Sequence, residues 1–183
     1  DDGISIVVTS LCRHPTLKDL YIGRNEFSYN GAKAVAVALG INKTLISVDM
    51  EENKICHHGS ENLGRTFRCN TTLVSLSLRR CGLDNEDVEL LSEGLIENRS
   101  LHQLSLACNL IRDSGAKMLA DVLRVNKTLN DVNLGYNKIG DEGASALFEV
   151  LELSGLETLS LTSNQISDTL KGKNFGGKVI FYQ

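Results

Sequence analysis

The sequence predicts an α/β solenoid, a curved arc with parallel β-strands on its concave face and α-helices on its convex face. A nine-residue pattern recurs six times, starting at residues 17, 45, 73, 101, 129 and 156, with steps of 28, 28, 28, 28 and 27 residues. Each copy alternates apolar with polar residues, and the segment after it carries apolar residues at helical spacing. A fixed period in this range is typical of repeat architectures, in which each unit packs on its neighbours.

The nine-residue copies predict short strands with one buried side. They read LKDLYIGRN, LISVDMEEN, LVSLSLRRC, LHQLSLACN, LNDVNLGYN and LETLSLTSN. In the fifth copy Leu129, Val132 and Leu134 are the apolar positions. Alternation of this kind places apolar side chains on one face of a strand. Strands from successive repeats then pair into a parallel sheet, whose apolar face must be covered.

The second half of each repeat predicts the covering helix. Residues 113–127 read DSGAKMLADVLRVNK, and residues 141–155 repeat the same spacing of alanine and leucine. Asp113 and Asp141 begin these segments, and we expect them to be N-cap residues because a carboxylate can accept free amide protons. Helices are wider than the roughly 4.8 Å between strands, so the stack should curve into a horseshoe arc.

The pattern L-x-x-L-x-L-x-x-N/C resembles the leucine-rich repeat family. The resemblance implies that the residues at the last position of this pattern form a ladder, in which each side chain makes hydrogen bonds to the backbone of the turning loop. A cysteine at this position can make such bonds only weakly. The ladder residues are Asn25, Asn53, Cys81, Asn109, Asn137 and Asn164. A column of glycines follows the ladder at Gly31, Gly59, Gly115 and Gly143, with Asp87 as the exception. Glycine should relieve crowding where the loop enters the helix.

The full 28-residue unit resembles the ribonuclease-inhibitor-like subclass, and NKTL, which opens two repeats, is most like the NOD-like receptor type. That resemblance implies a sensing or autoinhibitory arm that acts on a nucleotide-binding domain outside this chain. Ran GTPase-activating protein and tropomodulin belong to the same subclass. GTPase activation and a cytoskeletal or ciliary structural role therefore stay open as alternatives.

We expect one leucine-rich repeat domain over residues 1–168, with a half repeat at 1–16 before the six repeats. Residues 169–183 depart from the pattern and form either a cap or a tail. An open solenoid end exposes its core, and no polar N-terminal cap is visible. The chain is therefore expected to be a fragment of a longer protein.

Composition and motif searches exclude several function classes. The net charge of −4 provides no basic footprint for nucleic acid, and no apolar run is long enough to span a bilayer. Five cysteines without tight spacing favour reduced thiols and a cytoplasmic protein. The sequence has no G-x-S-x-G, G-x-x-x-x-G-K-S/T or H-E-x-x-H motif. We expect no enzyme, no cofactor and no small-molecule substrate.

Three local motifs invite a functional interpretation that the repeat makes unnecessary. Four Asn-x-Ser/Thr glycosylation motifs lie one repeat apart and should instead end helices with a left-handed asparagine; they begin at Asn42, Asn70, Asn98 and Asn126. His57 and His58 adjoin Cys56, but no second ligand pair accompanies them, so we expect solvated loop histidines and no metal site. Cys108 should be partly exposed, and no local signature marks it as a nucleophile.

The outward-facing strand positions predict the binding surface for a protein partner. Arg79 and Arg80 lie 28 residues after Glu51 and Glu52, so these side chains should pair across adjacent strands. Tyr21 and Tyr136 are the aromatic residues expected on this face, and aromatic and arginine side chains dominate interface hot spots. The predicted partner-binding residues are Tyr21, Arg24, Asp49, Glu51, Glu52, Arg79, Arg80 and Tyr136. The other outward positions are mostly small and polar.

Overall fold

Helices and strands alternate along the chain in a computed structural model that describes residues 2–12, 14–173 and 175–181. The description leaves out residues 1, 13, 174, 182 and 183. Two of these belong to the predicted half repeat at 1–16 and three to the C-terminal segment at 169–183. The helices are α1 (Asp2–Leu11), α2 (Tyr29–Ile41), α3 (Cys56–Phe67), α4 (Asn85–Leu95), α5 (Asp113–Val125), α6 (Asp141–Val150) and α7 (Asp168–Lys171). The strands are β1 (Asp19–Tyr21), β2 (Ser47–Asp49), β3 (Ser75–Ser77), β4 (Gln103–Ser105), β5 (Asp131–Asn133), β6 (Thr158–Ser160) and β7 (Val179–Ile180).

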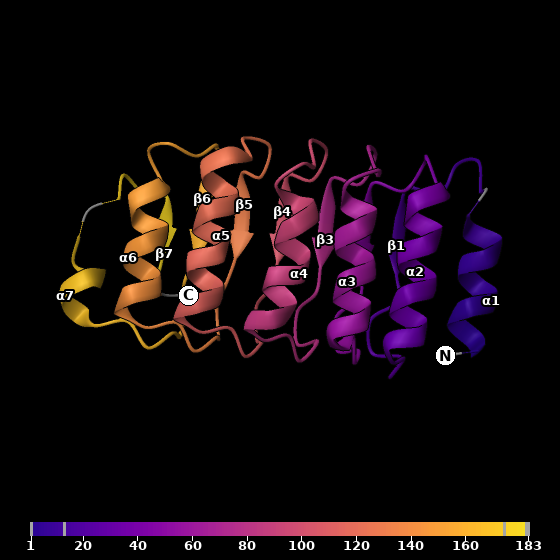
Figure 1. The fold of residues 1–183 in the computed structure, drawn as a ribbon, viewed down its shortest axis with the longest axis horizontal. Coiled ribbons are helices and arrows are strands. Elements are labelled where there is room, and N and C mark those ends of the chain that lie inside the picture. Colours follow the sequence, from indigo (N-terminus) through magenta and orange to yellow (C-terminus); the bar gives the residue numbers. More distant parts are fainter. Residues whose placement is uncertain (1, 13, 174, 182–183) are drawn as a thin grey trace.

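The strands form one parallel sheet in the order of the sequence (Figure 1). From β1 to β5 each residue pairs with the residue 28 positions later, as Leu20 does with Val48 and Leu104 with Val132. Between β5 and β6 the offset is 27, for example from Val132 to Leu159. The repeat spacing thus becomes the strand register directly.

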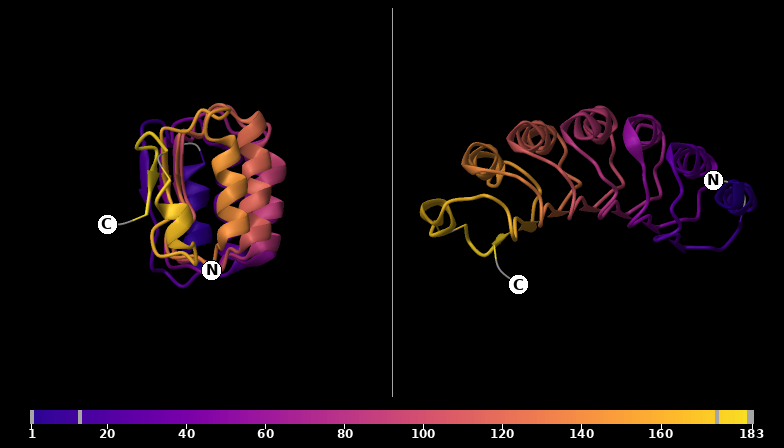
Figure 2. Two further views of the ribbon diagram at one scale, coloured as in Figure 1. Left: turned by 90° about the vertical axis from the view of Figure 1, so that its left-hand side faces the viewer. Right: turned by 90° about the horizontal axis from the view of Figure 1, so that it is seen from below.

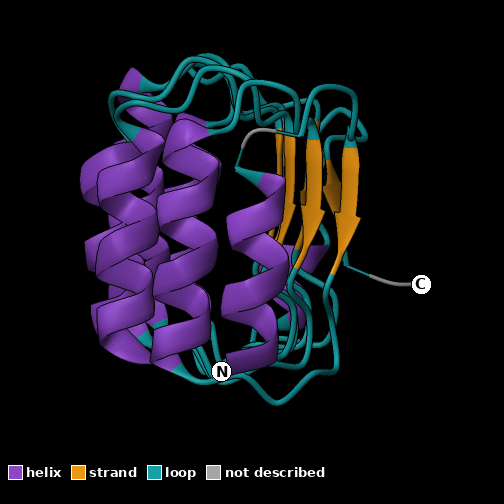
Figure 3. Ribbon diagram, turned by 90° about the vertical axis from the view of Figure 1, so that its right-hand side faces the viewer, coloured by secondary structure: helices purple, strands orange, loops and turns teal. Residues whose placement is uncertain are grey.

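The helices cover one face of the sheet and leave the other face free (Figure 3). Seen along the strands, the two layers follow an arc with helices on the outer, convex side and strands on the inner, concave side (Figure 2). This confirms the predicted α/β leucine-rich-repeat solenoid. Among the described residues, no helix has the length and hydrophobicity needed to cross a bilayer.

The core lies between the two layers and is built from the apolar positions of the repeat. The opening leucines of the second to sixth copies are each at most 2% exposed. The other two apolar strand positions, such as Val132 and Leu134, are equally buried. Helix residues such as Leu119 and Leu123 face them from the convex side. Burial of a leucine-sized side chain contributes about 1.5–3 kcal/mol, so the repeated apolar positions are the main source of stability.

Glycine is required where successive repeats approach most closely. A Cβ atom on Gly59 would lie 2.7 Å from Ile55 Cγ2 and 2.8 Å from Ala32 Cβ, so the glycine column relieves crowding as predicted. A Cβ atom on Gly94 would lie 1.8 Å from the carbonyl oxygen of Gly64. The backbones of α3 and α4 are therefore in direct contact at this pair.

The C-terminal segment continues the sheet and covers the last repeat. The short strand β7 pairs in parallel with β6, through Leu159 with Val179 and Ser160 with Ile180. Phe148 of α6 packs against Phe175, with ring centroids 4.1 Å apart, and Phe181 lies against both rings. The helix of this segment, α7, has only 4 residues.

The predicted N-cap roles of Asp113 and Asp141 are wrong. The N-cap residues of α5 and α6 are Arg112 and Gly140, and each aspartate is the first residue inside its helix. The Asp113 carboxylate instead accepts hydrogen bonds from backbone N–H groups at the start of the next helix, α6. Because its partner lies one repeat away, this arrangement is invisible to local capping rules.

A second asparagine ladder occupies the positions of the glycosylation motifs. Asn42 and Asn126 have φ values of −65° and −76°, so the predicted left-handed conformation is wrong. All four side chains are buried, and each Nδ2 donates to a carbonyl of the preceding repeat; for Asn126 the acceptor is Leu95, at 2.6 Å. Since Nδ2 is the atom that carries an N-linked sugar, the folded domain offers no accessible acceptor at these sites.

Candidate functional site

The loops that follow the strands form one edge of the concave face, here called the rim. The side chains of the asparagine ladder hold these loops in place by hydrogen bonds to the backbone. Asn53 donates from Nδ2 to the carbonyl oxygens of Ile22, at 3.0 Å, and Met50, at 2.9 Å. Its Oδ1 accepts hydrogen bonds from the backbone N–H groups of Asn25 and Phe27 in the preceding repeat. Asn109 and Asn137 repeat this geometry with buried side chains. Each of these three asparagines therefore joins two turns of the solenoid, whereas the Asn25 side chain donates within its own turn.

Cys81 takes one place in this ladder as a hydrogen-bond donor. Its thiol donates to the carbonyl oxygens of Met50, at 3.3 Å, and Arg79, at 3.5 Å. Burial raises the pKa of the Cys81 thiol to about 12, so the group stays neutral and retains its proton. A thiol is a weaker donor than an amide, and this repeat is therefore held less firmly at its rim.

The residue before each ladder position adopts the left-handed backbone conformation. Arg24, Glu52, Arg80, Cys108, Tyr136 and Ser163 have φ values between 52° and 59°. Such values are uncommon outside glycine, and here the hydrogen bonds of the ladder hold them. Four of them, Arg24, Glu52, Arg80 and Tyr136, are among the partner-binding residues predicted from the sequence. Their conformation was not predicted, because none of the six is glycine. The fixed turn directs each side chain out over the same edge of the concave face.

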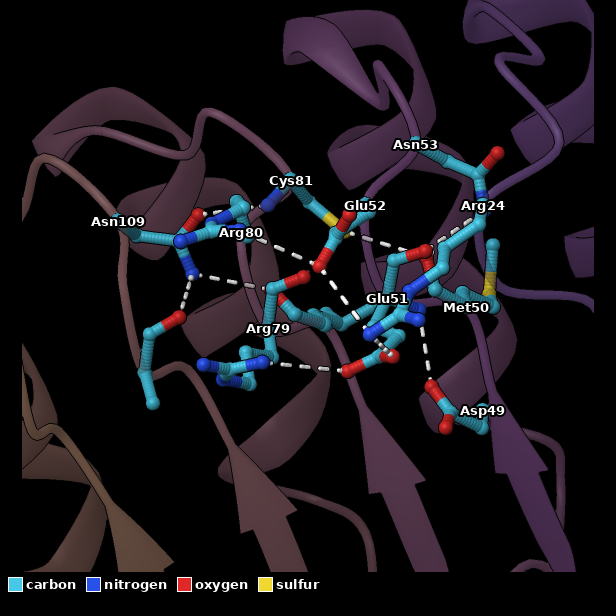
Figure 4. A network of polar contacts seen from close by, with 12 residues as sticks. Arg24, Asp49, Met50, Glu51, Glu52, Asn53, Arg79, Arg80, Cys81 and Asn109 are labelled. Carbon is cyan, nitrogen blue, oxygen red and sulfur yellow. Dashed lines mark hydrogen bonds and ion pairs between the residues drawn. The ribbon is translucent and has the colours of Figure 1, made fainter.

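Five charged side chains meet in one ion-pair network at this rim (Figure 4). The Arg24 guanidinium lies 3.1 Å from a Glu51 carboxylate oxygen and 3.5 Å from one of Glu52. Arg79 pairs with Glu51 at 3.5 Å, and Arg80 pairs with Glu52 at 3.3 Å. The pairs predicted from the 28-residue spacing are therefore present, and Arg24 joins them from the preceding repeat.

The network is accessible at the surface, mainly through its arginine side chains. The arginine side chains are between 39% and 66% exposed, whereas the two glutamates are 22% and 27% exposed. Exposed ion pairs contribute about 0–1 kcal/mol each to stability, so folding alone gives little reason for four of them in one place. The Cys108 thiol of the next repeat is the main cause that raises the pKa of the Arg79 guanidinium above its usual value.

Of the remaining predicted partner-binding residues, Asp49 and Tyr21 lie near the network and Tyr136 lies far from it. Asp49 lies beside it, because its Oδ1 accepts a hydrogen bond from the Glu51 backbone at 2.8 Å. Tyr21 is 76% exposed and pairs in register with Asp49 on the neighbouring strand. Tyr136 is 58% exposed but lies after β5, several strands away. The structure thus brings seven of the eight residues together and places Tyr136 at the far side of the concave face.

The structure places His57 in a helix and not in the loop that was predicted from the sequence, although its side chain is half exposed. It lies in the first turn of α3, and its Nδ1 is 3.1 Å from Asp87 Oδ1. The Asp87 carboxylate is the main cause that raises the pKa of His57 above its usual value. The structure describes one group of three histidine, cysteine or carboxylate side chains that lie close enough together to share a metal ion. Among the described residues this group is His57, Asp84 and Asp87.

This cluster is explained by the way α4 begins. Asp84 caps the helix by accepting hydrogen bonds from Glu86 and Asp87, and Asp87 accepts one from the Asp84 backbone. His57 occupies the position that Asn85 and Asp113 hold in the next two repeats, where an oxygen caps the following helix. A histidine cannot accept two amide protons in this way. Asp84 accepts them in α4 instead, and Asp87, which stands in place of the column glycine, accepts the Asp84 amide proton and contacts His57. We assign the cluster a structural role.

The middle of the concave face is hollowed over β3, β4 and β5. The hollow has a volume of about 200 Å³ and is lined mainly by the outward residues of these strands. The lining is Ser75, Leu76, Ser77, Gln103, Leu104, Ser105, Asp131 and Asn133. It therefore lies between the ion-pair network and Tyr136, on the free face of the sheet.

Comparisons with known proteins agree with this architecture. The family described as Leucine Rich repeat matches residues 13–36, 69–92, 97–120, 125–148 and 156–169, more than half of the chain. Among curated protein sequences there is no match. A solved structure titled "Leiomodin-1 Actin-Binding Site 2 (ABS2)" is similar with a TM-score of 0.68 and 14% identity, covering 83% of this chain and 87% of that one.

A second solved structure, the tropomodulin C-terminal domain of Caenorhabditis elegans, has a TM-score of 0.54 and 14% identity, covering 90% of this chain and 82% of that one. At this identity both likenesses concern the fold alone. The family match, the 28-residue strand register and the two asparagine ladders lead to one conclusion: the chain belongs to the leucine-rich repeat family.

Proposed function

We propose that this chain is a non-catalytic scaffold that binds a partner protein on its concave face. The observation that carries the proposal is the exposed ion-pair network of Arg24, Glu51, Glu52, Arg79 and Arg80, held on a rim of fixed left-handed residues. A preorganised charged surface loses little entropy on binding, and charge complementarity favours a particular partner. No cofactor or small-molecule substrate enters this proposal.

The proposal is tested by removing the predicted anchors without touching the core. The triple variant Tyr21→Ala, Arg79→Ala and Tyr136→Ala is compared with wild type for partner capture by affinity purification and quantitative mass spectrometry. The matched control is Tyr29→Ala with Arg65→Ala, which truncates exposed residues of the helical layer. Capture should fall at least tenfold in the triple variant and stay unchanged in the control, with equal thermal unfolding. Equal capture by all three proteins would overturn the assignment to the concave face.

A cytoskeletal partner is the second candidate. It is favoured by the two solved structures with similar folds, one of which is titled as an actin-binding site of leiomodin-1. Cosedimentation of the chain with filamentous actin tests it directly. Depletion of the chain from the supernatant, reversed by the triple variant, would identify actin as the partner; an undiminished supernatant would exclude it.

Finer assignments follow from the resemblance in the sequence. We infer a place in the ribonuclease-inhibitor-like subclass, a cytoplasmic location and a sensing or autoinhibitory role of the NOD-like receptor type. The five free cysteines and the buried glycosylation motifs support the location. GTPase activation has less support. Arg24 is the nearest candidate for stabilising a transferred phosphate, and its guanidinium is already paired with the carboxylates of Glu51 and Glu52. A GTP hydrolysis assay with small GTPases tests that alternative.

A further inference from the structure

The hollow on the concave face contains an acidic group that the ion-pair network leaves out. Asp131 is half-buried in the lining, and among the described residues its carboxylate has neither an ion pair nor a hydrogen-bond partner. Burial raises the pKa of Asp131, which reflects the cost of holding a charge where water is partly excluded. A carboxylate in such a place gains more from a cationic partner than a fully solvated one does.

The groups around Asp131 suit a hydrogen-bond donor. Gln103 pairs in register with Asp131 on the adjacent strand, and Ser105 lies on the same face of the sheet. The Ser105 hydroxyl and the Gln103 side-chain carbonyl are acceptors beside the carboxylate. Leu76 and Leu104 are the apolar residues of the lining, and both are at most 2% exposed, so the hollow presents polar atoms to an occupant.

The charges of the concave face supply no cation of their own for this position. Arg24, Arg79 and Arg80 are all committed to Glu51 and Glu52 by ion pairs. After these pairs are counted, the acidic residues of this face that have no cationic partner among the described residues are Asp19, Asp49 and Asp131. Asp131 is the one charged residue among the described residues that line the hollow, so the charge that the hollow presents to a partner is negative.

We propose that the hollow over β3, β4 and β5 seats a lysine or arginine side chain of the partner, with its cationic head at Asp131 and hydrogen bonds to Ser105 and Gln103. This rests on the proposed function, because it specifies the chemistry of a partner on the same face. An anionic side chain would be repelled by Asp131, and an apolar one would leave the carboxylate desolvated and unpaired. The partner segment that crosses the middle of the arc is therefore basic.

The test uses two labelled hexapeptides, acetyl-Lys-Ser-Lys-Ser-Lys-Ser-amide and its counterpart with norleucine in place of lysine. Each is titrated into the full chain at low ionic strength. Backbone amide shifts in two-dimensional NMR locate the contact, and the concentration dependence gives the affinity. The variants are Asp131→Asn and, as a charge-matched control, Glu89→Gln, which removes one exposed carboxylate from α4 on the convex side.

The lysine peptide should shift the amides of Ser77, Ser105 and Asn133, and Asp131→Asn should weaken its binding about tenfold, as loss of a partly desolvated charge pair does. Glu89→Gln and the norleucine peptide should show no such effect. Equal weakening by both variants, shifts confined to other surfaces, or no binding at all would overturn the inference. If the native partner is lost in the Tyr21, Arg79 and Tyr136 triple variant but retained at full affinity by Asp131→Asn, the proposed function stands and only this inference is wrong.

Discussion

Asp113, the first residue of α5, caps α6 by accepting a hydrogen bond from the backbone N–H of Gly143 at 3.0 Å. The same oxygen, Oδ1, accepts from Gly140 at 2.6 Å. One repeat earlier, Asn85 accepts from Gly115 at 3.1 Å in the same manner. Each of these helices is thus completed by its predecessor, which couples the stability of neighbouring repeats as expected for a solenoid.

Asp113→Ala should lower the free energy of unfolding by about 1–2 kcal/mol, because two N–H groups at the start of α6 lose their acceptor. Asp121→Ala, at an exposed position of the same helix, is the control and should change stability by less than about 0.5 kcal/mol. Urea titration followed by circular dichroism measures both. Equal losses would show that the inter-repeat cap contributes nothing.

His57 should make stability depend on pH through its contact with Asp87. Because the folded pKa is raised above the unfolded value of 6.5, the stabilisation is fully present below pH 6.5 and is lost as the pH rises through the folded pKa. The stability difference between wild type and His57→Gln should therefore be larger at pH 5.5 than at pH 8.5. The ring is half exposed, so solvent keeps the difference small. A difference that grows with rising pH would contradict the assignment.

Cys81→Asn should raise the free energy of unfolding by about 1 kcal/mol, since an amide both donates and accepts where the thiol donates weakly. The rim is regular in register at this repeat, so the introduced amide can adopt the ladder geometry seen at Asn109. The reverse change, Asn109→Cys, should lower stability by about 1–3 kcal/mol. Thermal and urea unfolding of the two variants measure these changes, and shifts of the same sign would refute the explanation.

Gly94→Ala should destabilise the chain by about 1–3 kcal/mol or more, because the added methyl group would meet the Gly64 carbonyl oxygen and push α3 and α4 apart. At Gly3, a Cβ atom would meet nothing within 4 Å, so Gly3→Ala serves as the helical control. Unfolding in urea compares the two. A tolerated alanine at position 94 would mean that the two helices are less closely packed than described.

The sequence was sufficient to predict the parts of the structure that repeat. The apolar period gave the parallel sheet, its register and the convex helices, and the same 28-residue step predicted the pairing of Arg79 with Glu51 and of Arg80 with Glu52. These features follow from position within a repeat. They need no knowledge of how one repeat tilts on the next.

The features that sequence analysis missed depend on contacts between repeats. Asp113 has the local pattern of an N-cap residue, yet its hydrogen-bond partners belong to α6. Asn126 has the pattern of a left-handed helix end, yet its side chain donates to Leu95 in the preceding repeat. Tyr136 has a left-handed backbone conformation, which the sequence does not indicate because the residue is not glycine. The half-buried position of Asp131 is not marked in the sequence, because residues of the neighbouring strands line the hollow around it.

The central claim is that the concave face contacts the partner, and site-specific photocrosslinking tests it most directly. The photoreactive residue p-benzoylphenylalanine is introduced at Tyr136 on the concave side or at Tyr29, the first residue of α2, both exposed tyrosines. After irradiation in cells, crosslinked proteins are identified by mass spectrometry. Our account predicts a defined crosslinked partner from Tyr136 and none from Tyr29. A partner captured from Tyr29 alone would contradict it and place the binding surface on the helical side of the arc.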